Sequence, residues 1–258
     1  MTELLAHLEA ARRAGHKMLV PYLMGGIPDR HSWPAALAQV SAEADAVEVG
    51  LPYSDPLMDG PVIAAAGERA IRSGLGPLDV LALRCEKRPD TPRIVMTYYN
   101  PVYRIGEEEF CRRAAGAGYA GVIVPDIPVE ESGGLRREAR SAGLAWIPLV
   151  APTSSAQRVE RICSTATGFV YAVSTLGVTG AREELSERAG RVVAACRAAT
   201  DLPVLVGIGI TTASQARAAA ATADGVVIGS AVVSAVLDRG AEAAAAFLRA
   251  VRSALDDA

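Results

Sequence analysis

The sequence is poor in the residues that build metal sites, disulfide frameworks and histidine-based triads. It contains only four cysteines and three histidines. The cysteines lie far apart and form no C-x-x-C pair, so we expect reduced thiols rather than a disulfide framework or a thiolate metal site. The histidines, His7, His16 and His31, fall near the N-terminus, away from any expected strand end. This distribution argues against a Ser-His-Asp triad and a histidine metal cluster.

Long apolar runs and concentrated charge of one sign are also missing. No apolar run reaches 18 residues, although 50% of the chain is hydrophobic and can build a large core. Residues 1–14 predict an amphipathic helix with charges throughout, without the apolar stretch of a signal peptide. The net charge of -3 suggests neither a nucleic-acid nor a membrane partner. We therefore expect a cytoplasmic protein.

What the sequence has instead is a repeated alternation of short Val/Ile-rich runs with longer helical patterns. Several runs are apolar almost throughout, as expected for parallel strands that are buried on both faces. The intervals carry helical spacing, as over 107–117, 154–165 and 212–221. The eight expected strands span residues 18–24, 46–51, 93–99, 121–126, 145–151, 168–174, 203–209 and 225–229.

Eight strand-then-helix units in a chain of 258 residues predict an α/β fold of the (β/α)8 TIM-barrel type. An open, doubly wound sheet is the alternative. No linker, low-complexity stretch or composition break divides the chain, so we expect one domain over 1–258, with an extra N-terminal helix before the barrel.

Two of the expected strand-to-helix connections, 52–61 and 175–182, are unusually long. Barrel active sites lie in such loops, at the carboxyl ends of the strands. Proline and glycine punctuate the first loop, which predicts a rigid shape. The second loop contains two glycines and few large side chains, so it fits either a mobile lid or an ordinary surface loop.

Glu48 is the only charged residue in the second expected strand, between Val47 and Val49. Alternation turns both valines toward the helices and Glu48 toward the barrel interior. A carboxylate there must be paired, neutralised or functional. Loss of solvation would raise its pKa and suit it to proton transfer near neutral pH. A structural glutamate held by internal hydrogen bonds is the alternative, but the position favours function.

Asp55 and Asp59 follow Glu48, in the loop directly above that strand. Two carboxylates over one cavity can form an acid/base pair whose surroundings separate their pKa values. The alternative for both aspartates is turn chemistry, because Ser-Asp-Pro and Asp-Gly-Pro are ordinary turn formers. Spacing alone slightly favours the turn.

Two glycine turns end the seventh and eighth expected strands, at 207–209 and 228–230. In barrels a phosphate often binds the backbone N–H groups after these two strands, at a helix N-terminus. Tight turns alone would also explain the glycines. Near other strand ends, Tyr22, Tyr98 and Tyr171 are candidates to line the barrel mouth.

Several of these segments resemble the signature of tryptophan synthase α subunits. They are residues 48–61, 124–132, 177–180 and the two glycine turns, and the resemblance runs in order along essentially the whole chain. The first segment is very specific, whereas glycine turns alone would fit many phosphate-binding barrels.

The resemblance implies a TIM barrel that cleaves indole-3-glycerol phosphate by retro-aldol chemistry into indole and glyceraldehyde 3-phosphate. Glu48 then matches the acid/base that protonates indole C3, and Asp59 matches the group that binds the indole N–H. Thr179 matches the lid residue that bonds this aspartate on closure. The phosphate site would comprise Gly180, Gly209, Gly229 and Ser230, and the indole pocket Tyr22, Ile63, Met96, Tyr98, Ile123 and Tyr171.

The family also implies a partner. Its α subunit docks on a β subunit, a separate chain, in an αββα complex, and the loop bearing Asp55 helps to signal between them. No metal or organic cofactor is implied for this chain, because the family's pyridoxal phosphate belongs to the β subunit. Several relatives carry an arginine in the lid where this chain has Thr175.

Three other functions stay open at this point. The chain could be a stand-alone lyase of the same chemistry that releases free indole. It could be a weakly catalytic barrel that serves mainly as an allosteric module for a β-like enzyme, which the intact Glu48 and Asp59 argue against. A different phosphate-binding barrel is the third alternative, and the run from Asp55 to Pro61 argues against it.

Overall fold

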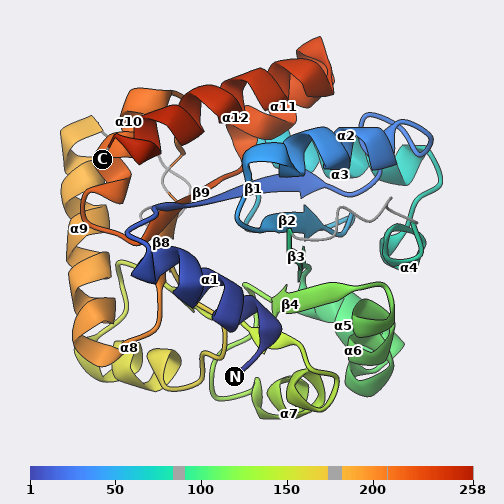
Figure 1. Cartoon of the computed structure of the whole chain (residues 1–258). Coiled ribbons are helices and arrows are strands. Elements are labelled where there is room, and N and C mark those ends of the chain that lie inside the picture. The colour runs from blue at the N-terminus through green and yellow to red at the C-terminus, as the bar shows by residue number, and fades with distance from the viewer. Residues whose placement is uncertain (84–90, 174–181, 208, 258) are drawn as a thin grey trace.

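The computed structural model describes residues 1–83, 91–173, 182–207 and 209–257 (Figure 1). In these ranges nine parallel strands form one sheet in the order β5-β4-β3-β2-β1-β9-β8-β7-β6. The strands are β1 (Met18–Met24), β2 (Val47–Gly50), β3 (Arg93–Met96), β4 (Tyr119–Ile123), β5 (Ala145–Trp146), β6 (Leu149–Val150), β7 (Val170–Val173), β8 (Val204–Gly207) and β9 (Gly225–Ile228).

The two outer strands of this order, β5 and β6, are the halves of one extended segment. Proline has no backbone N–H, so Pro148 interrupts the ladder between them. On one side the Ile147 amide donates to the Val122 carbonyl at 3.1 Å, and on the other the Tyr171 amide donates to the Pro148 carbonyl at 3.0 Å. The segment therefore joins β4 to β7 and closes the sheet into a barrel. The predicted TIM barrel is confirmed, with its fifth strand split in two.

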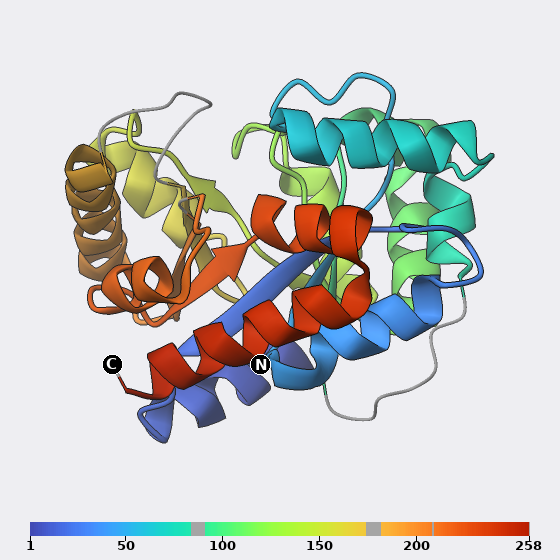
Figure 2. The ribbon, with the colours of Figure 1, turned by 90° about the horizontal axis from the view of Figure 1, so that it is seen from above.

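Helices surround the barrel, and α12 lies along α11 and α2 on its outside (Figure 2). The three helical patterns named above are confirmed, two with a side-chain cap, Ser155 for α8 and Thr212 for α10. The helices are α1 (Glu3–Arg13), α2 (Trp33–Val40), α3 (Pro61–Arg72), α4 (Pro77–Leu81), α5 (Tyr99–Ile105), α6 (Glu107–Gly116), α7 (Gly133–Ser141), α8 (Ala156–Cys163), α9 (Arg182–Ala199), α10 (Ala213–Ala220), α11 (Ser230–Arg239) and α12 (Ala241–Asp256), with a 3-10 turn η1 (Ser41–Glu43).

The predicted N-terminal helix, α1, closes one end of the barrel (Figure 1). Thr2 caps it, and its apolar face carries Leu4 and Leu8, both fully buried. These leucines pack with Met18, Ile94 and Phe169 in an interior cluster separate from the larger cluster between the strands and the helices. Because α1 fills the end at which the strands begin, the opposite end is left for a site.

Three of the four cysteines lie within the described residues. Cys111, Cys163 and Cys196 are buried free thiols, as the sequence predicted, whereas Cys85 falls outside the described part. Among the helices described here, none is long and apolar enough to cross a membrane.

Candidate active site

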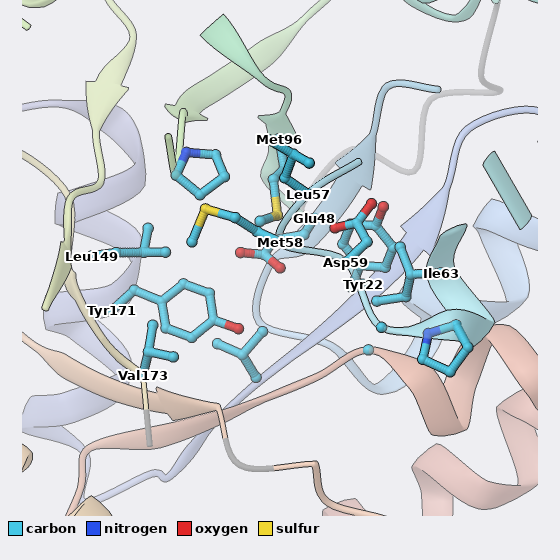
Figure 3. Close-up of a pocket in the computed structure, with 15 residues that line it drawn as sticks. Tyr22, Glu48, Leu57, Met58, Asp59, Ile63, Met96, Leu149, Tyr171 and Val173 are labelled. Carbon is cyan, nitrogen blue, oxygen red and sulfur yellow. The ribbon is translucent and has the colours of Figure 1, made fainter. Parts of the chain in front are cut away.

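A cavity of about 550 Å³ lies where the strands end, away from α1 (Figure 3). Residues of β1, β2, β3, β6, β7 and β9 and of the connections after β2 and β4 contribute to it, as expected for the catalytic end of a barrel. Its walls are mainly apolar, with two carboxylates and two tyrosines. The lining residues are Tyr22, Glu48, Leu57, Met58, Asp59, Gly60, Pro61, Ile63, Met96, Pro125, Leu149, Tyr171, Val173, Val227 and Gly229.

Glu48 points into this cavity from β2, as alternation predicted. Val47 and Val49 pack in the outer core, whereas the Glu48 side chain lines the cavity and is only 1% exposed. Its Oε1 atom has no hydrogen-bond partner among the described residues. Burial raises the pKa of Glu48 from 4.5 to about 8. Glu48 is therefore a carboxylic acid that keeps its proton near neutral pH and can donate it.

The two tyrosines that face Glu48 come from opposite sides of the barrel. Tyr22 pairs with Glu48 across the β1–β2 ladder, and Tyr171 comes from β7 (Figure 3). Burial raises the pKa of both phenols. Negative charge on Asp59 and then on Glu48 raises the pKa of Tyr22 further, and negative charge on Glu48 raises that of Tyr171. Both tyrosines therefore remain neutral, with hydroxyls that can donate or accept hydrogen bonds in the cavity.

Asp59 lies in the same cavity, at the end of the loop between β2 and α3 (Figure 3). Burial raises the pKa of its carboxyl, and a hydrogen bond with the Tyr98 side chain acts in the opposite direction. Asp59 therefore binds a distant side chain, which turn chemistry would not require. Asp55, by contrast, is exposed, and its carboxylate accepts from the neighbouring Ser54 hydroxyl at 2.5 Å.

Part of the expected phosphate site lies within the described residues. Gly229 lines the cavity and precedes α11, whose first residue is Ser230. The first N–H groups of a helix have no carbonyl of a preceding turn to bind, so they can bind an anion. A Cβ on Gly229 would lie 3.3 Å from the Ile63 Cδ1 atom, so the absence of a side chain keeps this corner open. Gly209 adopts a φ of +55°, and neither it nor Ser230 is among the lining residues.

The predicted apolar pocket is largely assembled. Tyr22, Ile63, Met96 and Tyr171 line the cavity, whereas Tyr98 and Ile123 are not among its lining residues. Ile123 is fully buried in the interior cluster, and Tyr98 lies beside the loop that carries Asp59.

Sequence reasoning missed eight wall residues. Leu149, Val173 and Val227 are at or near strand ends, where alternation along each strand could have found them. The residues that lead from β2 into α3, together with the proline after β4, had no such periodic signal. The missed residues are Leu57, Met58, Gly60, Pro61, Pro125, Leu149, Val173 and Val227.

Three positions of the expected lid, Thr175, Thr179 and Gly180, lie outside the described residues. The expected partner-facing position, Asp55, is on the surface of the loop between β2 and α3. Two residues along, the apolar Leu57 side chain is 93% exposed. Met58 beside it is 46% exposed, so the loop presents two neighbouring apolar side chains at the surface.

Comparison with known proteins identifies the family of the chain. A family model described as Tryptophan synthase alpha chain matches residues 8–256. The tryptophan synthase alpha chain of Streptomyces avermitilis is 47% identical over 249 residues, covering 95% of this chain and 89% of the relative. That of Carboxydothermus hydrogenoformans is 47% identical over 225 residues, covering 86% and 84%.

Solved structures give the same result. Tryptophan synthase from M. tuberculosis superposes with a TM-score of 0.90 at 36% identity, over 98% of both chains. Tryptophan synthase subunit alpha from Legionella pneumophila superposes with a TM-score of 0.89 at 32% identity, over 100% of both chains. With sequence and structure matched over nearly its whole length, the chain belongs to the tryptophan synthase alpha chain family.

Proposed function

We propose that this chain is a carbon–carbon lyase of tryptophan biosynthesis that cleaves indole-3-glycerol phosphate into indole and glyceraldehyde 3-phosphate. The observation that carries the proposal is Glu48, a buried carboxylic acid that keeps its proton near neutral pH, in the same cavity as Asp59. A retro-aldol cleavage at indole C3 needs one proton donor at carbon and one acceptor at the ring nitrogen.

Glu48 supplies the proton in this mechanism. Its carboxyl group protonates indole C3, which makes that carbon tetrahedral and breaks the aromaticity of the ring. The bond from C3 to the glycerol carbon then breaks, and its electron pair restores the indole. The hydroxyl on that carbon loses its proton and becomes the aldehyde. The Glu48 carboxylate left by the first step can accept this proton, so the proton balance closes within the site.

Asp59 stabilises the charge that develops on the ring nitrogen when C3 is protonated. Its carboxylate accepts a hydrogen bond from the indole N–H, and this bond strengthens as the nitrogen becomes positive. Partial burial of Asp59 strengthens the interaction, because few waters compete with it. The two carboxylates therefore have different tasks, and their different degrees of burial suit them to these tasks.

The substrate's remaining parts fit the ends of the cavity. About 550 Å³ lies in the range of small-molecule sites. Tyr22, Ile63, Met96 and Tyr171 would contact the indole. Gly229 and the first N–H groups of α11 would bind the phosphate, with Gly209 and Ser230 beside them and Gly180 contributing from the lid. Thr179 of the lid would instead hydrogen-bond Asp59 on closure. Each step is a proton transfer or a bond cleavage, so this chain needs no cofactor of its own.

We also propose that a separate β subunit docks on the surface that carries Asp55 and Leu57, in an αββα assembly. Exposed apolar area beside a carboxylate supports a protein partner at this loop. The loop ends in Asp59, so docking can alter the site, and ligands of either subunit would then affect the other. One domain and a cytoplasmic location remain predictions.

The test is the steady-state rate of indole release from indole-3-glycerol phosphate, with and without a cognate β subunit. We expect a slow basal rate that rises by about tenfold or more, which corresponds to about 1.4 kcal/mol of barrier lowering. A fast basal rate that the partner leaves unchanged would instead identify a stand-alone indole-producing lyase. Absence of indole under both conditions would overturn the lyase assignment.

A further inference from the structure

Tyr98 was expected in the wall of the indole pocket, but its hydroxyl serves the loop that carries Asp59. Tyr98 directly precedes α5 and is only 6% exposed. Its hydroxyl oxygen accepts a hydrogen bond from the Met58 backbone N–H at 2.9 Å. The same hydroxyl makes a hydrogen bond with the Asp59 carboxyl. One phenol can make both contacts, because its oxygen accepts while its O–H donates.

The loop between β2 and α3 depends on this contact, because the side chains directly before Asp59 are exposed. Leu57 is 93% exposed and Met58 46% exposed, directly before Asp59. Within the loop, the Asp59 amide donates to the Pro56 carbonyl at 3.2 Å, a local contact that does not attach the loop to the barrel. The hydrogen bond from Met58 to Tyr98 spans 40 positions of the chain and joins the loop to the end of β3.

A second layer holds the Tyr98 ring. The Tyr53 ring lies against it, with centroids 5.2 Å apart and an interplanar angle of 34°. The Asn100 side-chain amide donates to the Tyr53 hydroxyl at 2.8 Å. Asn100 is exposed, so this chain of contacts runs from the surface through two tyrosines to Asp59.

We infer that Tyr98 is the positioning residue for Asp59. Its hydroxyl holds the end of the loop and aims the Asp59 carboxylate into the cavity, and Tyr53 and Asn100 hold the Tyr98 ring in place. This inference rests on the proposed function, because it takes Asp59 as the group that stabilises the indole nitrogen. A hydrogen bond fixed before the reaction costs no reorganisation when charge develops, and a small displacement of such a group lowers the rate strongly.

The first experiment compares Tyr98→Phe with Tyr103→Phe in the complex with a β subunit. Tyr98→Phe keeps the ring and its packing and removes only the hydroxyl. Tyr103 lies on α5, the helix that Tyr98 precedes; its side chain is 72% exposed, and it is the matched control. We expect Tyr98→Phe to lower kcat about tenfold with KM changed less than about twofold, the loss expected of a group that acts in the transition state. Tyr103→Phe should match the unchanged protein.

The pH profile separates positioning from a general structural defect. The Tyr98 hydrogen bond favours the ionised form of Asp59, so its removal raises the pKa of Asp59. The acid limb of kcat/KM should therefore move to higher pH in Tyr98→Phe and stay in place in Tyr103→Phe. The other carboxylate whose charge reaches Tyr98 is Asp126, which is unchanged in both variants.

A double-mutant cycle completes the test. In an Asp59→Asn background, Tyr98→Phe should cause no further loss, because the group that it positions is already gone. Tyr53→Phe should lower kcat by only about twofold, which is less than the loss expected for Tyr98→Phe. Equal kcat and equal pH profiles for Tyr98→Phe and the unchanged protein, with Asp59→Asn strongly impaired, would overturn the positioning role and leave the lyase assignment intact. Full activity of Asp59→Asn would instead overturn the role assigned to Asp59.

Discussion

The two ends of this barrel are built from the same strands but have opposite character. β1 carries Met18 into the apolar cluster under α1, and four residues on it presents Tyr22 to the cavity. At the α1 end, Leu4 and Leu8 close the interior with apolar contacts alone. At the other end, Glu48 is as deeply buried but carries a carboxyl group whose Oε1 atom lacks a partner among the described residues.

This difference shows that one end of the barrel stabilises the fold and the other carries the reactive groups. Burial of apolar side chains at the α1 end stabilises the fold. Burial of a carboxyl group at the cavity end destabilises it whenever that group ionises. Substitutions at the cavity end should therefore lower activity, and substitutions at the α1 end should lower stability.

The largest effect is expected at the cavity end, from Glu48→Gln. The amide keeps the size of the side chain but cannot donate a proton to indole C3. We expect indole release to fall by about 10²–10⁴-fold, the range of general acid catalysis. The measurement is kcat at neutral pH, with Glu68→Gln, on the outer surface of α3, as the control that should retain full activity. An unchanged rate in Glu48→Gln would remove the chemical distinction between the two ends.

A loss of stability is expected at the α1 end, from Leu8→Ala. Removing this fully buried side chain leaves a cavity and should lower the free energy of unfolding by about 2–5 kcal/mol. Leu5→Ala, on the same helix but only partly buried, should cost less. Denaturant titration gives the stability, and kcat per folded molecule should stay the same in both variants. If Leu8→Ala impaired kcat in the folded enzyme, the two ends would not be independent.

The pH dependence of stability gives the smallest change per pH unit. Burial raises the pKa of Glu48 from 4.5 to about 8, so between these values the folded chain holds a proton that the unfolded chain releases. Stability conferred by protonated Glu48 is therefore lost as pH rises through this window, by at most about 1.4 kcal/mol per pH unit. Glu48→Gln should remove this slope and become the more stable protein near pH 8. Parallel stability curves for the two proteins would show that Glu48 is not buried in this way.

Much of the barrel was predictable because local sequence carries it. The spacing of apolar runs gave the strand positions, and alternation around Glu48 gave its inward direction. The split of the fifth strand was not foreseen, although Pro148 was visible, because a proline interrupts a ladder only when both neighbouring strands are in place. In the site, Glu48, Asp59 and Gly229 were named from the sequence and line one cavity. Leu57 and Met58 were missed because a loop has no period.

The sequence by itself determined which residues alternate, where helices begin and which side chains can exchange protons, since these depend on neighbours along the chain. Only the tertiary structure decided that the barrel closes through Ile147 and Pro148. It also decided that Glu48 loses its solvent and keeps its proton, and that the Tyr98 hydroxyl reaches Met58 and Asp59 instead of the pocket wall. These outcomes depend on solvation and on contacts between residues far apart in the chain, which no local pattern encodes.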